Sequence, residues 1–453
     1  MDQLRFYSTL SKKIEAFKPI KDKKVNLFVC GPTVYDFAHI GNAKTYTQFD
    51  FMVRYLRFRG YEVFYLQNIT DIDDKIIKRA AERGVGWKKL AGEFEQKYLE
   101  DMQALHNTAV NQYARATDYI PQITKQVKVL LGKGYAYKTS DGIYFDIGKF
   151  PDYGKLSGRT EGSRDDAVSR IDESRDKKNK NDFALWKFSK PGEPVWETEL
   201  GAGRPGWHIE DTAITESFFG PQYDVHGGAV DLIFPHHEAE IAQMEAASGL
   251  SPLVRYWIHV AFLNINAEKM SKSKGNFLTA REATEKYGYR LLRYFFISQH
   301  YRTTLDFSEQ NLAQAKGALT RLDEFVLDLD TRYEDNKNQE DTKKLKVEIV
   351  AKLDNDWDTP GAIASIFNFI RQQHTRGKSG KNVYRLFQEL NQMFDFLDFG
   401  VPKIADGVQK LVDSREQLRK EKKFTEADDL RKKIAEMGYE IKDTAEGVKV
   451  NKI

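Results

Sequence analysis

The feature that most constrains the fold is a strand-like, then helical, then strand-like pattern near the start of the chain. A short apolar run at residues 25–30 is followed by a turn and by apolar residues at helical spacing, among them Phe49, Met52 and Leu56. A second strand-like run follows at residues 61–66. Two buried strands that are joined by a helix form a parallel pair through a crossover connection. The pattern therefore predicts the opening of a doubly wound α/β sheet.

The predicted sheet is interrupted and then resumed. A further apolar run at residues 223–226 leads through two glycines to a helix that we expect to begin near Pro235, since proline suits the first helical turn. Between the two halves, residues 121–205 include a tyrosine-rich piece and the polar, lysine-rich segment 161–181. This composition is typical of an insertion that carries a mobile loop.

The last third of the chain changes to a helical pattern. From Ser308 onward, apolar residues follow one helical stripe, and Thr359 with Pro360 indicates a helix start. In the final unit we expect a helix from Thr425, which stands in a capping-box position, to Gly438, followed by a short strand.

Together these patterns predict an α/β fold, with a Rossmann-like parallel-sheet domain split by an insertion and followed by a helical bundle and a small α+β C-terminal domain. The expected boundaries are 1–122 and 206–250 for the two halves of the Rossmann domain, 123–205 for the connective insertion, 251–307 for a stem region, 308–400 for the bundle and 401–453 for the C-terminal unit.

Composition narrows the possible roles. The 453 residues exceed what one core usefully fills, and 70 Lys and Arg nearly cancel 67 Asp and Glu, so a nucleic-acid surface would have to be a local basic patch. The single cysteine excludes an intramolecular disulfide, and no signal core or membrane-length apolar run is present. We therefore expect a cytoplasmic protein with no membrane role.

Residues 31–44 (GPTVYDFAHIGNAK) place three candidate phosphate-binding residues at the predicted strand-to-helix turn. A helix N-terminus offers unpaired N–H groups and a positive dipole end, and Gly41 lets an anion approach the backbone. His39 and Asn42 would add side-chain donors. A lone histidine near a helix start is more often structural, so this segment needs a partner motif.

That partner is the Lys-Met-Ser-Lys-Ser run at residues 269–273. Lys269 and Lys272, with hydroxyls between them, can close over a triphosphate and stabilise the charge that builds on the α-phosphate and the pyrophosphate leaving group. A lysine and serine run alone is usually solvated loop, but the two elements in this order are highly specific.

The two elements resemble the His-Ile-Gly-His and Lys-Met-Ser-Lys-Ser signatures of class I aminoacyl-tRNA synthetases. Asn42 stands where the class signature usually has its second histidine. Asparagine donates a hydrogen bond but cannot become cationic.

Four further residues are candidate metal ligands. Cys30 ends the first predicted strand, Asp211 lies further along the chain, and His236 and Glu240 stand four residues apart on one helical face. A thiolate, an imidazole and two carboxylates are all competent zinc ligands. Taken singly, Cys30 is more often core filler, and His236 with Glu240 more often a surface pair.

The segments around these residues resemble cysteinyl-tRNA synthetases in particular. The matching segments are residues 68–75 (NITDIDDK), 203–210 (GRPGWHIE), 226–228 (HGG) and 234–238 (FPHHE). In that family two cysteines, a histidine and a glutamate hold one zinc ion, and the substrate thiolate becomes a further ligand. Here Asp211 occupies the position of the second family cysteine, which leaves a harder coordination sphere.

The same resemblance implies the remaining site residues. Thr70, Trp207 and His226 would line a pocket for L-cysteine, while Gly41, Gly228, Asp231 and Lys272 would hold ATP, which brings Mg²⁺. The implied reaction forms cysteinyl-adenylate and transfers cysteine to the 3′-terminal adenosine of tRNA-Cys, with His39, Asn42, Lys269 and Lys272 stabilising charge. The resemblance also implies that the helical bundle and the C-terminal unit bind tRNA, and we expect a monomer.

Two alternatives remain. A cysteine ligase that passes the adenylate to a small amine would have little use for the roughly 140-residue helical C-terminal region. A non-catalytic, synthetase-like RNA-binding protein would be expected to have eroded phosphate motifs, whereas the lysine run at residues 269–273 is intact.

Overall fold

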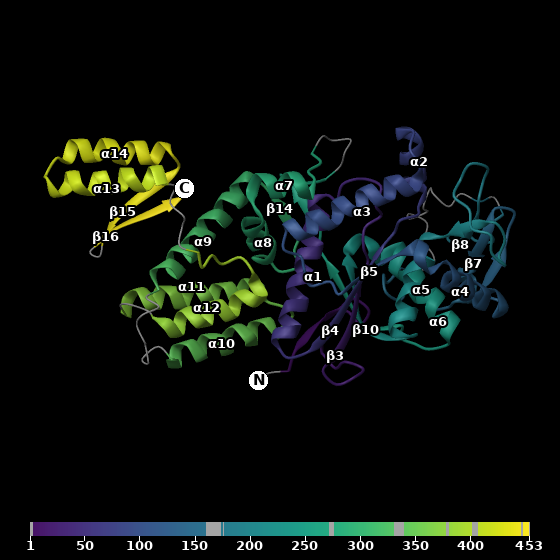
Figure 1. Cartoon of the computed structure of the whole chain (residues 1–453). Coiled ribbons are helices and arrows are strands. Elements are labelled where there is room, and N and C mark those ends of the chain that lie inside the picture. Colours follow the sequence, from purple (N-terminus) through teal and green to yellow (C-terminus); the bar gives the residue numbers. More distant parts are fainter. Residues whose placement is uncertain are drawn as a thin grey trace. The chain divides into compact units, whose positions relative to one another are not determined.

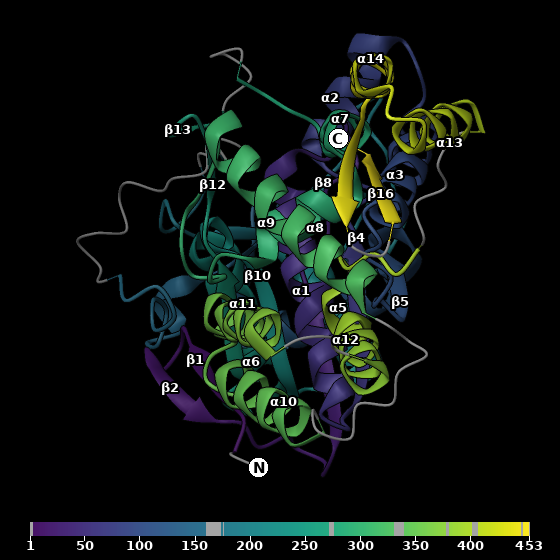
Figure 2. The same ribbon diagram turned by 90° about the vertical axis from the view of Figure 1, so that its left-hand side faces the viewer.

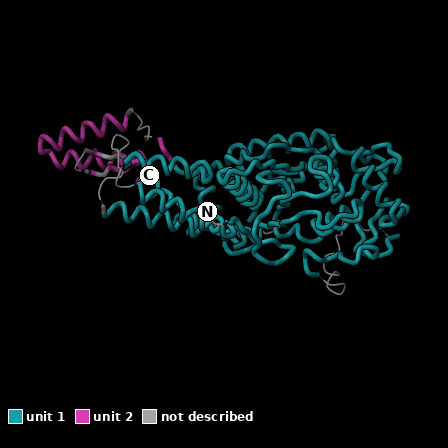
Figure 3. Tube along the Cα trace, turned by 90° about the horizontal axis from the view of Figure 1, so that it is seen from below, with its two compact units in different colours: residues 1–322, 329–397 teal, residues 323–328, 398–453 magenta. Residues whose placement is uncertain are grey.

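A computed structural model describes residues 3–159, 174, 176–270, 276–329, 339–376, 380–400, 406–444 and 447–452. The chain divides into two compact units (Figure 3). The first comprises residues 1–322 and 329–397, and the second comprises residues 323–328 and 398–453. None of the described helices has both the length and the apolar character needed to cross a bilayer.

A five-stranded parallel sheet forms the centre of the first unit, which confirms the predicted Rossmann-like α/β fold (Figure 1). Its strand order is β11-β10-β3-β4-β5. The chain runs from β3 outward through β4 and β5, then returns to the other side of β3 for β10 and β11. The strands are β3 (Lys24–Val29), β4 (Glu62–Ile69), β5 (Gln112–Arg115), β10 (Tyr223–Ala229) and β11 (Val254–Val260).

This reversal of strand order beside β3 is the point where open α/β sheets form a crevice at the carboxyl ends of their strands. Buried apolar side chains of β3 and β4, such as Phe28 and Leu66, hold the register. β11 continues the sheet beyond residue 250, so the parallel sheet extends past the point where we expected its second half to end.

Helices connect these strands. The crossovers use α1 (Ile40–Phe58), α2 (Asp74–Arg83), α3 (Trp87–Ala104) and α6 (Glu238–Ser248). α1 is buried along most of its length. Before α6 the chain forms two short irregular turns at Val230–Leu232 and Ile233–His237, so Pro235 precedes the regular helix instead of starting it.

The interruption between the two halves of the sheet is an antiparallel sheet with strand order β6-β7-β8-β9. Aromatic and aliphatic side chains of this region pack on α4 and α5, for example Phe145, Phe183 and Trp186. Its elements are β6 (Ala136–Lys138), β7 (Gly142–Phe145), β8 (Phe183–Phe188), β9 (Gly203–Pro205), α4 (Ile120–Gly132) and α5 (Trp207–Phe219), with short 3-10 turns at Ala116–Tyr119 and Ile147–Lys149.

Smaller elements complete the first unit. The hairpin of β1 (Arg5–Ser8) and β2 (Lys13–Ala16) contacts β11, and a three-stranded sheet has the order β13-β12-β14. Figure 2 shows α10, α11 and α12 grouped together. The remaining elements are β12 (Leu263–Ile265), β13 (Glu268–Lys269), β14 (Leu305–Phe307), α7 (Ala280–Tyr287), α8 (Tyr289–Ile297), α9 (Glu309–Asp328), α10 (Gln339–Leu353), α11 (Thr359–Arg376) and α12 (Lys381–Phe394).

The second unit has residues 323–328 of α9, two further helices and a hairpin, α13 (Asp406–Lys420), α14 (Phe424–Glu436), β15 (Tyr439–Thr444) and β16 (Gly447–Lys452). It encloses its own small apolar core, which includes Val408, Ile434 and Val450. The prediction that Thr425 caps the last helix is wrong, because α14 already begins at Phe424 with Lys423 in the capping position. Gly438 follows the helix end with φ of +83°, where glycine is favoured.

Candidate active site

The candidate site lies at the carboxyl ends of β3, β4 and β10, where the strand order reverses. Cys30 directly follows β3, and its backbone N–H donates to the Gly227 carbonyl of β10 at 3.1 Å. Thr70 directly follows β4, and His226 lies within β10. The sheet therefore brings together residues that are up to about two hundred positions apart in the sequence.

A buried cluster of metal-binding side chains surrounds Cys30. Two groups of four have their donor atoms within 4.8 Å of one another, and Cys30 and Glu240 belong to both. We call them the aspartate set (Cys30, Asp211, His236 and Glu240) and the histidine set (Cys30, His226, His237 and Glu240).

The aspartate set contains the four residues that the sequence singles out as metal ligands. Cys30 Sγ lies 3.3 Å from Asp211 Oδ2. His236 Nε2 lies 3.0 Å from Asp211 Oδ2 and 3.0 Å from Glu240 Oε1. The spacing of four residues between His236 and Glu240 therefore places both side chains toward Cys30, although Glu240 lies in α6 and His236 in the turn before it.

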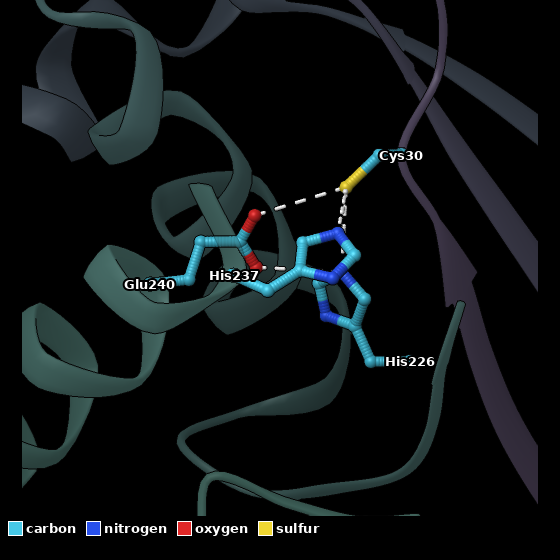
Figure 4. A group of neighbouring side chains, drawn as sticks. All are labelled: Cys30, His226, His237 and Glu240. Atoms are coloured by element: carbon cyan, nitrogen blue, oxygen red, sulfur yellow. Dashed lines mark hydrogen bonds and ion pairs between the residues drawn. The ribbon is translucent and has the colours of Figure 1, made fainter. Parts of the chain in front are cut away.

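The histidine set meets at the same thiol, with His226 from β10, His237 from the turn before α6 and Glu240 from α6 (Figure 4). Cys30 Sγ lies 3.3 Å from His226 Nε2 and 3.1 Å from His237 Nε2. His226 Nε2 also lies 3.3 Å from Glu240 Oε2. His226, which we expected in the substrate pocket, is fully buried within this cluster.

Partners around the cluster fix the orientation of its side chains. Asn68 donates to Asp211 at 2.5 Å and accepts from the Gly31 N–H at 2.5 Å. Thr70 donates to the buried carboxylate of Glu210. Thr70 also accepts from Asn68 at 3.4 Å, so it belongs to the hydrogen-bond network that reaches Asp211.

Burial and neighbouring charges shift the pKa values of the side chains in the cluster. Burial, together with the carboxylates of Glu240 and Asp211, holds the pKa of the Cys30 thiol well above its usual value. Burial raises the pKa of Glu240 to about 8. Burial also lowers the pKa values of His226 and His237, which keeps both imidazoles neutral. The carboxylates of Glu240 and Asp211 outweigh burial at His236 and raise its pKa to about 9. A thiol, imidazoles and carboxylates in a dry site fit a divalent cation, whose charge would favour the thiolate and carboxylate forms.

A cavity of about 360 Å³ opens beside the cluster. Trp207 contacts both, because its ring stacks on His236 with centroids 4.1 Å apart and also lines the cavity. The candidate residues that line the cavity are Cys30, His39, Gly41, Asn42, Trp207, Asp231 and Lys269.

Other candidate residues lie behind the cavity wall. Thr70, Gly228, Asp211, His236 and Glu240 do not line it. A Cβ atom at Gly228 would come within 2.8 Å of His237 and 3.0 Å of Leu232, a cavity residue, so glycine here permits close packing. Lys272 lies outside the described residues.

Asn42 has a role that the sequence interpretation missed. His39 is the N-cap residue of α1; its backbone N–H donates to Asn42 Oδ1 and its Nδ1 accepts from the Asn42 N–H, both at 3.2 Å. This reciprocal capping box fixes the start of α1 at the cavity. The helix end that we expected to bind phosphate is therefore ordered by the two candidate residues themselves.

About one turn into α1, Lys44 is also buried and was not singled out from the sequence. Its Nζ donates to the carbonyls of Ala261 at 2.7 Å, Phe262 at 3.0 Å and Thr303 at 3.2 Å. Ala261 and Phe262 line the cavity. Lys44 therefore ties the helix that starts at His39 to the chain that leads to Lys269.

Sequence reasoning also missed two histidines that extend the cluster. His208 Nδ1 lies 2.7 Å from His236 Nδ1, and His259 Nε2 lies 2.8 Å from His237 Nδ1. The adjacent pair His236 and His237 was a signal for a second ligand, but the pattern does not show that both rings reach one thiol.

Comparisons with known proteins identify the family of the chain. Residues 16–317 match the family model for the catalytic domain of class I (C) tRNA synthetases, and residues 401–450 match the anticodon-binding domain of cysteinyl-tRNA ligase. The chain is 43% identical to a cysteine–tRNA ligase of Thermoplasma acidophilum, over 97% of this chain and 98% of the relative. It is 41% identical to one of Thermococcus onnurineus, over 98% of each chain.

Solved structures support the fold. A methionyl-tRNA synthetase of Mycobacterium tuberculosis in complex with methionyl-adenylate superposes with a TM-score of 0.61 at 16% identity, covering 82% of this chain and 88% of that chain. The relatives match nearly the whole chain, and the two family models match residues 16–317 and 401–450. The chain therefore belongs to the cysteine–tRNA ligase family of class I tRNA synthetases.

Proposed function

We propose that this protein is a cysteine–tRNA ligase, which activates L-cysteine with ATP and transfers it from cysteinyl-adenylate to the 3′-terminal adenosine of tRNA-Cys. The observation that carries the proposal is the buried thiol, imidazole and carboxylate cluster beside a cavity whose wall includes His39, Gly41 and Lys269. The cluster thus suits a thiol substrate, and the cavity suits a nucleotide.

Different residues along the cavity would serve different parts of the reaction. The N-terminus of α1, with His39 and Asn42, would bind the phosphates through its N–H groups and dipole. Asp231 would accept from the ribose hydroxyls, and Lys269 would stabilise the pyrophosphate as it leaves. The cysteine carboxylate attacks the α-phosphate, so positioning and charge stabilisation suffice and no side chain acts as nucleophile. Mg²⁺ would arrive with ATP.

The cluster would hold one zinc ion, which would bind the thiolate of cysteine and so exclude serine, whose hydroxyl is a poorer zinc ligand. Cys30 and Glu240 are proposed ligands in either donor set. Trp207, which contacts both the cluster and the cavity, would position the amino acid. On this proposal the enzyme works in the cytoplasm as a monomer.

The C-terminal match favours tRNA as the acceptor. Residues 401–450 match an anticodon-binding domain, which a ligase with a small amine acceptor would not need. A protein that only binds RNA would have no use for a metal cluster beside a cavity of about 360 Å³.

Pyrophosphate exchange into ATP tests the activation step. We expect exchange with cysteine and at least about 100-fold less with serine. Lys269→Ala should slow cysteine-dependent exchange about 100-fold, since removing one donor to developing charge typically costs that much. Lys286→Ala, on α7 and away from the cavity, is the matched control and should exchange at the wild-type rate. Equal exchange with both amino acids would contradict the assigned specificity.

A further inference from the structure

Trp207 packs against the buried cluster but also faces two hollows. Its ring stacks on His236 with centroids 4.1 Å apart, yet 38% of the residue is exposed. Trp207 lines both the cavity of about 360 Å³ and a second hollow of about 60 Å³. A ring lacks packing contacts on the sides that face hollows. Its position therefore depends on how the backbone before it is anchored.

The backbone before Trp207 is the edge strand of the insertion sheet. Trp207 is the first residue of α5, directly after β9 and Gly206, and this helix start has no side-chain cap. The Gly206 N–H donates to the Leu185 carbonyl of β8 at 3.0 Å. A Cβ atom at Gly206 would lie 1.9 Å from the Ala184 carbonyl oxygen, also in β8. The connection from β9 to α5 is thus packed directly on β8, so a shift of these strands would carry Trp207 with it.

One carboxylate links both strands to the Rossmann domain. Lys187 of β8 and Arg204 of β9 are cross-strand partners, and both reach Asp74, the first residue of α2 (Figure 1). Lys187 Nζ lies 2.9 Å from Asp74 Oδ2, and Arg204 Nη2 donates to Asp74 Oδ1. Asp74 therefore joins the insertion to α2 immediately before the chain reaches Trp207.

The arrangement of charges makes this link depend on Asp74. Like charges directly opposite each other on neighbouring strands repel, so Lys187 and Arg204 need an anion between them. Burial opposes ionisation of Asp74, but the two cations hold its pKa below its usual value. Glu193 Oε2 also lies 3.7 Å from Arg204 Nε, but Glu193 belongs to the insertion and cannot tie it to α2. Without the charge of Asp74, two cations would face each other, and Arg204 is only 5% exposed.

We infer that Asp74 is a positioning residue for the amino acid, because through Lys187 and Arg204 it sets the place of Trp207 on the cavity wall. The inference rests on the proposed function for the role of Trp207 in binding cysteine. Asp74 is not among the described residues that line the cavity, so it acts on the amino acid through the strands. A displacement at this link leaves the phosphate-binding start of α1 in place.

Pyrophosphate exchange by matched variants of the full-length protein tests the inference. Asp74→Asn keeps the shape of the side chain and removes its charge. It should raise the KM for cysteine about 10-fold and leave the KM for ATP within about twofold, because misplacing a positioning group by about 1 Å can cost up to about 100-fold. Arg204→Met breaks the same link from the other side and should have the same effect, so the test does not depend on one variant folding. An unchanged KM for cysteine in both variants, or an equal rise in the KM for ATP, would overturn the inference.

Glu199→Gln is the matched control. It breaks an exposed ion pair with Lys128 inside the same insertion. Exposed ion pairs contribute little, so both KM values should stay within about twofold of wild type. A rise in the KM for cysteine as large as that in Asp74→Asn would overturn the inference, because any charge change in the insertion would then have the same effect.

A double-mutant cycle shows whether Asp74 acts through Trp207. In a Trp207→Phe background, Asp74→Asn should change the KM for cysteine by less than about twofold, because residues that act through one another give non-additive effects. A rise in the double variant equal to that in Asp74→Asn alone would mean that Asp74 acts independently of Trp207, and would overturn the inference.

Fluorine NMR separates this inference from the proposed function. In protein labelled with 5-fluorotryptophan, the Trp207 resonance is assigned by its loss in Trp207→Phe. Asp74→Asn should shift this resonance and leave that of Trp357, which stacks on Phe6, in place. A shifted Trp207 resonance together with no cysteine-dependent exchange in the wild type would support the link and refute the function. Exchange in the wild type with an unmoved Trp207 resonance in Asp74→Asn would overturn the link and leave the function standing.

Discussion

Replacing Gly31 with alanine tests how tightly the strand ends hold the site. A Cβ atom at Gly31 would lie 1.7 Å from the backbone oxygen of Asn68, whereas real Cβ contacts essentially never fall below 3.0 Å. The ends of β3 and β4 would therefore have to separate by at least about 1.3 Å. Overpacking usually costs about 1–3 kcal/mol, and a clash with backbone should reach about 3 kcal/mol.

The same shift should disturb the metal cluster. Cys30 immediately precedes Gly31, and Asn68 donates to Asp211 at 2.5 Å. We expect Gly31→Ala to lower the midpoint of urea unfolding, followed by tryptophan fluorescence, and to reduce the zinc content of the purified protein. Gly92→Ala is the matched control, since a Cβ at this exposed position of α3 meets nothing within 4 Å.

The control should be stabilised by about 0.5–1 kcal/mol, because alanine is the better helix former. The reasoning would be refuted if Gly31→Ala unfolded within about 0.5 kcal/mol of wild type and kept its zinc, because the strand ends would then tolerate a separation that the packing forbids.

Three further perturbations test other parts of the account. Asn42→Ala removes half of the capping box and should cost about 1 kcal/mol in urea unfolding and slow cysteine-dependent exchange; unchanged exchange would contradict a role for this helix start. Burial lowers the pKa of Lys44 to about 7, below its unfolded value, so between pH 7 and 10 the unfolded chain binds more protons at this residue and its contribution to stability rises with pH. The difference in unfolding free energy between wild type and Lys44→Met should then grow by at most about 1.4 kcal/mol per pH unit, and parallel profiles would show that Lys44 stays charged. Stripping the metal with a chelator should lower the melting temperature and zinc should restore it, whereas an unchanged melting temperature would show that the cluster is stable without an ion.

Local pattern predicted the core of the fold well. The apolar run at residues 25–30 and the strand-like run at 61–66 correspond to β3 and β4, because strands buried on both faces read as continuous apolar runs. The start of α6 was predicted too early, since Pro235 suits an irregular turn as well as a first helical turn. At α14, Thr425 resembled a cap, but Phe424 already belongs to the helix.

The site could be predicted only in part. The four residues of the aspartate set could be singled out because each has donor chemistry within a distinctive segment. The histidine set could not, because the meeting of His226 and His237 at one thiol depends on the approach of β10 to the turn before α6. The cap formed by Asn42 depends on side-chain geometry that a residue type alone does not reveal.

Aminoacylation is the most direct test of the central claim. Purified protein with zinc, ATP and Mg²⁺ should attach labelled cysteine to a tRNA-Cys transcript, and should leave a transcript lacking its 3′-terminal adenosine uncharged. Serine should not be attached under the same conditions. Failure to charge tRNA-Cys with cysteine, by a protein that is folded and contains zinc, would contradict the assignment as a cysteine–tRNA ligase.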